Sequence, residues 1–150
     1  MKLATFLRKD GTQAVGAVDT TRGRIVDLAR AAGNQEPAFA SMLALIEQGE
    51  AGLARAREVV RRGGAEQELA GTVLLSPLPV PQQIRDCLVF EQHLVNAMKT
   101  WEAVTGKPSA PISPLWYQRP SWYKGNRFSF VGHEHDVNWP SYSEMMDFER

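Results

Sequence analysis

Two polar residues near the middle of the chain, Asp86 and His93, have types and a spacing that suit metal-assisted acid–base chemistry. Asp86 falls at the end of an expected strand, and His93 falls one turn into the helix expected after it. Carboxylate oxygens are preferred ligands of Mg²⁺, Mn²⁺ and Ca²⁺, and histidine is the side chain suited to take a proton from water near neutral pH. The spacing leaves a simpler interpretation open, in which Asp86 caps the helix and His93 is an ordinary, partly exposed side chain.

Two further groups of polar residues lie near the end of the chain. Asp147 and Glu149 alternate as on one face of a strand, so they are either half of a carboxylate cage or the polar face of that strand. His133 and His135 would point the same way only on a strand, and Gly132 before them favours a hairpin tip instead. A transition-metal site there would need ligands from elsewhere, so we expect a solvated turn.

Aromatic residues gather in the second half of the chain, where Trp116-Tyr117 and Trp122-Tyr123 flank a proline. Aromatic side chains in a loop can line a ligand pocket, with the tyrosine hydroxyl as a polar group, or form a core or a partner surface. The sequence does not decide between these interpretations.

The first half of the chain predicts a small structural domain. Alternating apolar residues separated by Asp/Gly turns indicate an antiparallel meander, and later apolar residues recur at helical spacing. We expect strands at residues 3–7, 15–18 and 24–28, and helices at residues 37–46 and 53–60. We interpret the basic residues 61–62, which glycines follow, as a solvated helix end.

The proline-rich segment at residues 76–81 marks a domain boundary, because alternating prolines favour a stiff, extended connector. We predict an N-terminal cap domain at residues 1–75 and the beginning of a second domain at 76–150. Beyond residue 72 we expect four short strands, at residues 73–75, 84–88, 127–131 and from residue 145. We also expect a helix at residues 89–104, a loop at 110–120 and a turn at 132–138.

Composition and charge limit the classes of function. The chain has 17 basic (Lys and Arg) and 17 acidic residues, and neither half is strongly basic, which argues against a nucleic-acid or membrane-surface partner. No run approaches the roughly 20 apolar residues of a membrane span. Cys87 is the single cysteine, and we expect it to be buried and inert. One cysteine favours a reducing compartment, so we expect a cytoplasmic protein.

Four segments, in this order and spacing, resemble the fumarylacetoacetate hydrolase family. Residues 85–93 (Arg-Asp-Cys-Leu-Val-Phe-Glu-Gln-His) resemble the family segment with a metal-ligand aspartate and, seven residues on, a catalytic histidine. Residues 122–125 (Trp-Tyr-Lys-Gly) resemble the segment with a substrate-contacting tyrosine, and 126–140 the strand and hairpin after it. Residues 146–149 (Met-Asp-Phe-Glu) resemble the start of the acidic motif Asp-aromatic-Glu-x-Glu.

The resemblance implies roles for five residues. Asp86 and Glu149 would bind the metal, His93 would be the general base, and Tyr123 with its neighbour Lys124 would contact the substrate. The implied fold is α+β, with a small domain of β-meander and helices followed by the start of a mixed β-roll catalytic domain. The implied activity is metal-dependent hydrolysis of a carbon–carbon bond in a small diketo or oxo-acid such as an acylpyruvate, with Mg²⁺, Mn²⁺ or Ca²⁺. A homodimer is implied for the full-length protein.

Several positions depart from the family pattern. Arg150 follows Glu149 where the acidic motif would continue, so we expect these residues to belong to a longer enzyme and the 150-residue chain to be inactive alone. Leu88 and Glu102 stand near positions where members that cleave fumarylacetoacetate carry a substrate tyrosine and arginine, which argues against that substrate. An isomerase or decarboxylase of the same family, and a non-catalytic binding module, remain open alternatives.

Overall fold

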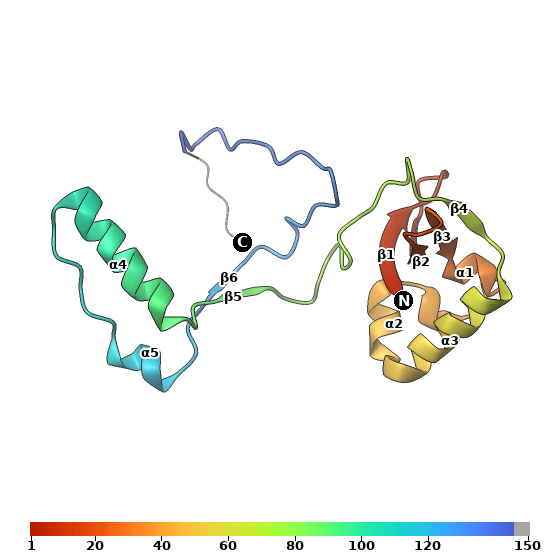
Figure 1. Cartoon of the computed structure of the whole chain (residues 1–150), viewed down its shortest axis with the longest axis horizontal. Coiled ribbons are helices and arrows are strands. Elements are labelled where there is room, and N and C mark those ends of the chain that lie inside the picture. Colours follow the sequence, from red (N-terminus) through yellow and green to blue (C-terminus); the bar gives the residue numbers. More distant parts are fainter. Residues whose placement is uncertain (146–150) are drawn as a thin grey trace. The chain divides into compact units, whose positions relative to one another are not determined.

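The computed structural model describes residues 1–145 and shows an α+β structure with an antiparallel first sheet (Figure 1). Its strands lie in chain order as β1 (Lys2–Leu7), β2 (Gln13–Asp19), β3 (Arg24–Asp27) and β4 (Glu66–Glu68). The predicted three-stranded meander is confirmed. The short, polar β4 was not predicted, because Glu-Gln-Glu carries no apolar alternation.

A tight turn sets the register between the first two strands. The Asp10 carboxylate accepts a hydrogen bond from the Thr12 N–H at 2.9 Å, and Gly11 has a φ of 80°. Glycine adopts this left-handed conformation without a Cβ clash. The resulting register places Thr5 of β1 opposite Val15 of β2.

Short helices follow the meander. They are α1 (Leu28–Ala31), the 3₁₀ helix η1 (Pro37–Phe39), α2 (Met42–Glu47) and α3 (Gly49–Arg62). The single helix predicted at 37–46 is divided, because Ser41 is extended and its hydroxyl accepts a hydrogen bond from the Ala44 N–H at 3.0 Å, which starts α2. The strand predicted to reach residue 28 ends one residue earlier, where α1 begins.

The two faces of the sheet carry separate apolar clusters. On one face Val15 and Val26 pack with residues of the helical segments such as Phe39. On the other face Phe6 and Ile25 pack together with partly buried apolar neighbours. The period-two alternation of strand side chains accounts for this division.

Gly16 in β2 allows the second cluster to close over the middle strand. A Cβ built at Gly16 would lie 2.5 Å from Cγ1 of Ile25 and 3.0 Å from Cε1 of Phe6. Both of those side chains have no exposed surface. The absence of a side chain at this position therefore lets residues of β1 and β3 approach each other across β2.

The strand predicted at residues 73–75 is reduced to a single bridge on the outer edge of β1. Leu74 bridges Phe6, the Leu7 N–H donates to the Val73 carbonyl at 3.0 Å, and the Leu75 N–H donates to the Thr5 carbonyl at 2.8 Å. The buried Thr5 hydroxyl donates to the Pro77 carbonyl at 2.6 Å. Prolines beyond this point cannot donate to the ladder, so the pairing stops.

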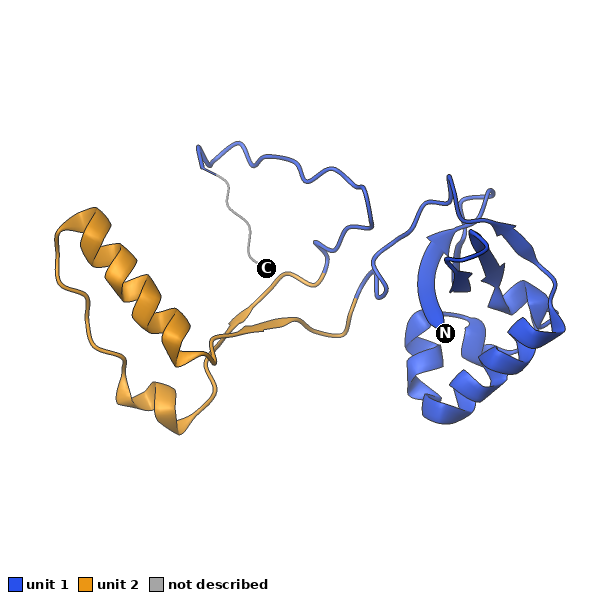
Figure 2. Ribbon diagram, viewed as in Figure 1, with its two compact units in different colours: residues 1–80, 128–150 blue, residues 81–127 orange. Residues whose placement is uncertain are grey.

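The chain divides into two compact units (Figure 2). The first takes in residues 1–80 and, within the described part of the chain, 128–145, and the second takes in residues 81–127. The change at residues 80–81 falls inside the proline-rich segment, and the predicted domains at 1–75 and 76–150 stay predictions. No helix in residues 1–145 is long and apolar enough to cross a membrane.

The second unit consists of four short elements. They are β5 (Arg85–Cys87), α4 (Glu91–Thr105), α5 (Pro114–Gln118) and β6 (Trp122–Lys124). The helix predicted at 89–104 is confirmed as α4. The loop predicted at 110–120 is wrong in part, because Ser113 caps a short helix that begins with proline.

The strand predicted at residues 127–131 is wrong. Residues 127–128 lie in a turn, and the structure shows no strand between residues 125 and 145. Neither sheet of residues 1–145 includes this segment, so its backbone takes no part in a strand ladder there. The strand predicted from residue 145 falls almost entirely outside the described residues.

Candidate functional site

Asp86 and Tyr123, two of the predicted site residues, lie directly opposite each other in a two-stranded antiparallel sheet. Strand β5 pairs with β6, and the register sets Asp86 against Tyr123. Residues in this relation project to the same face, with Cβ atoms about 4.5–5.5 Å apart. Both residues are exposed, Tyr123 at 74%. The structure therefore joins a carboxylate and a phenol hydroxyl on one open face.

Lys124, also predicted to contact the substrate, lies on the opposite face of this sheet. Successive strand residues point to opposite faces, so Lys124 shares its face with Arg85 and Trp122. The Arg85 guanidinium carbon lies 4.8 Å from the centroid of the Trp122 ring, a cation–π distance that agrees with this assignment. The structure does not bring Lys124 together with Asp86 and Tyr123.

His93 lies in the first turn of α4, as the sequence predicted. The His93 N–H donates to the Phe90 carbonyl at 3.1 Å, and Phe90 is the residue that caps the helix. No side chain caps this helix end, so Asp86 does not have the capping role that the simpler interpretation gave it. The His93 side chain is exposed, and its role as a base stays a prediction.

Helix α5 holds the connector that runs from β5 to α4. The Trp116 indole N–H donates to the Leu88 carbonyl at 2.8 Å, and the Tyr117 hydroxyl donates to Oε1 of Glu91 at 2.7 Å. The two rings meet edge to face, with centroids 4.9 Å apart and planes at 89°. The Leu88 N–H donates to the Ser121 carbonyl at 3.0 Å, which extends the β5–β6 pairing by one bond.

Through these contacts Trp116 and Tyr117 position the connector between β5 and α4, a role that the sequence did not reveal. The hydrogen bond to the Glu91 carboxylate raises the pKa of Tyr117 above its usual value, because it favours the neutral phenol. For Trp116 and Tyr117 the sequence left three interpretations open: a ligand pocket, a core and a partner surface. The signal that could have identified them is the Ser-Pro sequence at residues 113–114, which is typical of a helix start.

The residues that the structure describes do not form a divalent-metal site. Glu149, the second predicted ligand, lies outside the described residues, as does Asp147. Among residues 1–145 no group of three or more His, Cys, Asp or Glu side chains is placed to hold a metal ion. Asp86 is a suitable hard oxygen ligand, but one carboxylate does not make a site.

The segment at residues 133–136 contains the predicted turn, but no strands flank it within residues 125–145, so the predicted hairpin is not present there. Residues 133–134 lie in the turn, and Glu134 has a φ of 58°. The His133 ring and the Glu134 carboxylate approach to 3.6 Å, while His135 Nδ1 lies 3.4 Å from the His133 carbonyl oxygen. Within the described chain, neither histidine belongs to a group that could hold a metal.

The second unit has a cavity of about 460 Å³ between α4, residues 110–113 and α5. Leu88, Leu94, Met98 and Trp116 are among the residues that line it, with Arg119 as the charged group. None of Asp86, His93, Tyr123 and Lys124 lines this cavity. The aromatic loop thus contributes Trp116 to a cavity wall, next to the predicted site residues in the sequence but separate from their face.

No residue of the second unit is buried. Trp101 is 55% exposed and Trp122 48% exposed, although both are large and apolar. Cys87 is also exposed, so the prediction that it is buried is wrong. Its strand has a partner on one side only, and the residues that share its face, Arg85 and Trp122, are themselves exposed.

Comparisons with known proteins do not assign the chain. No protein-family model matches it, and no curated protein matches it. The family resemblance therefore stays a prediction, which rests on the four sequence segments.

Proposed function

We propose that this chain is the N-terminal part of a fumarylacetoacetate hydrolase-family enzyme that cleaves a carbon–carbon bond in an acylpyruvate-like oxo-acid. The observation that supports it best is the β5–β6 register, which sets Asp86 opposite Tyr123 on one face. His93 follows at the start of the helix after β5. The resemblance gives Asp86 the role of metal ligand and Tyr123 that of substrate contact, and the register would let both act on one substrate.

The three residues have separate roles in this proposal. Asp86 and Glu149 would hold a divalent ion, which would supply Lewis-acid polarisation of a substrate carbonyl. His93 would take a proton from water, whose oxygen attacks that carbonyl, and the bond to the neighbouring carbon would break with its electron pair leaving as an enolate. The protonated His93 would then return the proton to the enolate carbon. The Tyr123 hydroxyl donates to a substrate oxygen. Lys124 fits less well, because it lies on the other face of β6.

The exposure of the second unit fits an active site that a further protein surface completes. Hydrolysis of this kind needs a partly dehydrated site, and the Asp86 face is open to water in residues 81–127. We propose that the remainder of a larger catalytic domain, or the second subunit of a homodimer, covers it. The same surface would cover the exposed Trp101 side chain.

The test is acylpyruvate cleavage by the natural protein with Mg²⁺ or Mn²⁺, comparing His93→Ala with His135→Ala. His135 is a matched control, because it is also an exposed histidine but belongs to the turn at residues 133–136. We expect His93→Ala to lower kcat about 10²- to 10⁴-fold, the usual contribution of a general base. His135→Ala should leave kcat unchanged. Equal effects of the two substitutions would exclude His93 as the base.

A non-catalytic binding module, which the sequence left open, is the second candidate. It predicts no metal-dependent turnover of acylpyruvates, and an Asp86→Ala variant with unchanged stability and ligand binding. An isomerase or decarboxylase would instead consume the same class of acid without the hydrolysis products, which product analysis by NMR distinguishes.

A further inference from the structure

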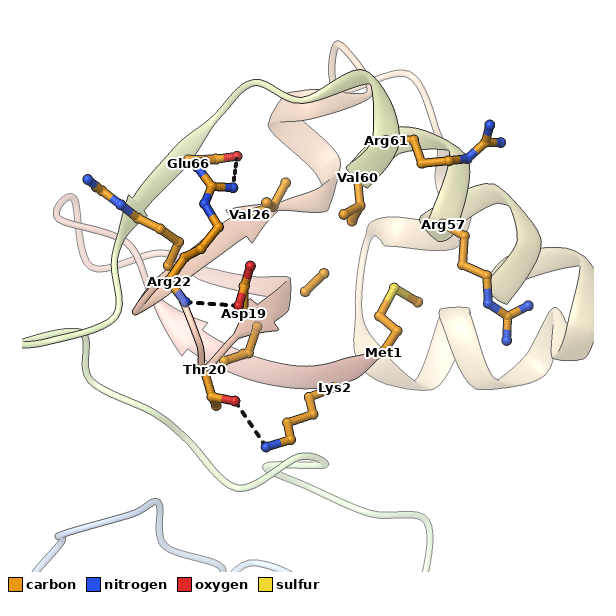
Figure 3. A pocket seen from close by; sticks show the side chains of 13 residues that line it. Met1, Lys2, Asp19, Thr20, Arg22, Val26, Arg57, Val60, Arg61 and Glu66 are labelled. Carbon is orange, nitrogen blue, oxygen red and sulfur yellow. Dashed lines mark hydrogen bonds and ion pairs between the residues drawn. The ribbon is translucent and has the colours of Figure 1, made fainter.

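A cavity of about 610 Å³ lies in the first unit, where β1 and β3 meet α3. Figure 3 shows Val26 and Val60 beside it, while the guanidinium groups of Arg57 and Arg61 point away from it and from each other. The cations of α3 are therefore not placed to hold a ligand in this cavity. The contacts that point to a further role lie in the second unit.

Two short connectors of the second unit are joined beside the β5–β6 pair. Residues 88–90 connect β5 to α4, and residues 119–121 connect α5 to β6. The Leu88 N–H donates to the Ser121 carbonyl at 3.0 Å, so the connectors continue the pairing of β5 with β6. Helix α5 therefore has a short, hydrogen-bonded link to the strand that carries Tyr123.

Side-chain packing does not fix the connector between β5 and α4. Val89 is 55% exposed and Phe90 is 76% exposed, so neither is held by a surrounding core. Hydrogen bonds from α5 reach the segment instead. The Trp116 indole donates to the backbone carbonyl at its start, and the Tyr117 hydroxyl donates to the Glu91 carboxylate at its end. A carboxylate acceptor makes the second of these bonds the stronger kind.

The contact at Glu91 acts on the first turn of α4, which carries His93. Glu91 is the first residue of the helix, and the Phe90 carbonyl before it accepts the His93 N–H at 3.1 Å and the Leu94 N–H at 3.4 Å. The direction in which this turn leaves the connector therefore sets where His93 lies. Asp86 lies on β5, just before the connector. The placement of the histidine relative to Asp86 thus depends on a segment that α5 holds at both ends.

We propose that Trp116 and Tyr117 are positioning residues, which set the orientation of His93 relative to the Asp86–Tyr123 pair. This inference rests on the proposed hydrolase function, in which His93 is the general base. Both residues act through the connector and not by contact with the substrate. A general base must lie within about 2.6–3.2 Å of the proton donor, and a misplacement of about 1 Å can cost roughly 10²-fold in rate. Loss of the positioning contact should therefore lower kcat and leave KM nearly unchanged.

The first test compares Tyr117→Phe with Tyr142→Phe in acylpyruvate cleavage by the natural protein with Mg²⁺ or Mn²⁺. Tyr117→Phe removes the hydroxyl and keeps the ring that meets Trp116 edge to face. Tyr142 is 92% exposed, so it is a control for the same chemical change. We expect Tyr117→Phe to lower kcat about tenfold, and Tyr142→Phe to change neither kcat nor KM. An unchanged kcat for Tyr117→Phe, in an enzyme that His93→Ala inactivates, would overturn the positioning role and leave the hydrolase function standing.

Substitutions at Glu91 separate the hydrogen bond from a general effect on the helix. Glu91→Gln keeps an oxygen that can accept the Tyr117 hydroxyl, whereas Glu91→Ala removes the acceptor. We expect Glu91→Gln to keep most of kcat and Glu91→Ala to lose about as much as Tyr117→Phe. The double variant Tyr117→Phe/Glu91→Ala should lose no more than either single variant, because both remove the same bond. Losses that multiply would show two independent effects and overturn the proposal.

A second measurement does not depend on turnover. In the 150-residue chain, ¹⁵N relaxation gives the amide order parameters of residues 89–93. We expect Tyr117→Phe to lower them from about 0.85 toward 0.6, and Tyr142→Phe to leave them unchanged, while circular dichroism shows that α4 is retained. Unchanged order parameters would overturn the proposal. If the natural protein did not cleave acylpyruvates, the proposed function would fail, and these data would still decide whether Tyr117 holds His93 in place.

Discussion

Substitution of Gly16 by alanine tests whether the packing of Phe6 and Ile25 across β2 leaves room for a side chain at position 16. The new Cβ would lie 2.5 Å from Cγ1 and 2.6 Å from Cδ1 of Ile25, and 3.0 Å from Cε1 of Phe6. Contacts under 3 Å with fully buried side chains require those side chains or the strand to shift. Overpacking of this kind costs about 1–3 kcal/mol. In a unit of this size, that corresponds to a melting temperature lower by roughly 4–24 °C.

The assay is thermal unfolding by far-UV circular dichroism, supported by amide hydrogen exchange in β1–β3, which reports on the first unit alone. A double-mutant cycle with Ile25→Val gives the specific test, because the shorter side chain removes the Cδ1 contact and can turn away from position 16. Ile25→Val alone should cost about 0.5–1.5 kcal/mol. We expect the double variant to be less destabilised than the sum of the singles, by about 1 kcal/mol. Additive effects, or a Gly16→Ala variant as stable as the parent, would refute the reasoning.

Three further predictions concern caps and positioning contacts. Glu91→Ala should lower the pKa of Tyr117 toward the usual tyrosine value, because the hydrogen bond to Glu91 is the main cause of the raised pKa. Ultraviolet titration of the phenol measures this pKa, and an unchanged titration would contradict the contact. Ser41→Ala should cost about 1 kcal/mol of unfolding free energy, because the Ala44 N–H loses its cap, and Ser41→Asp should restore it. Trp116→Phe removes the indole donor to the Leu88 carbonyl and should speed amide exchange in the connector, while exchange in β1–β4 stays unchanged.

The sequence predicted the elements that carry their own periodic pattern. Alternation gave β1 to β3, and helical spacing with a glycine after the last turn gave α4, whose end is marked by Gly106 with a φ of 66°. The sequence-based predictions failed where the formation of a strand depends on pairing with a strand elsewhere in the chain. The polar β4 forms because β3 offers an open edge, and residues 127–131 do not form a strand although their apolar residues alternate.

The candidate site was predicted as residue types and not as geometry. The positions of Asp86 on a strand and of His93 in the first turn of a helix follow from local patterns. The pairing of Asp86 with Tyr123 depends on a register between distant segments, which no local pattern contains. The separation of Lys124 from that face follows only once the register is known.

The bond between the Trp116 indole and the Leu88 carbonyl has a consequence for how the second unit folds. These residues are 28 positions apart, and closing such a loop costs chain entropy before any strand pairing repays it. Helix α4 lies within the loop and can form early from local contacts, whereas β5 and β6 meet late. We therefore expect the face that carries Asp86 and Tyr123 to assemble late and to open early, so that an occupant of that face would slow the opening of the β5–β6 pair.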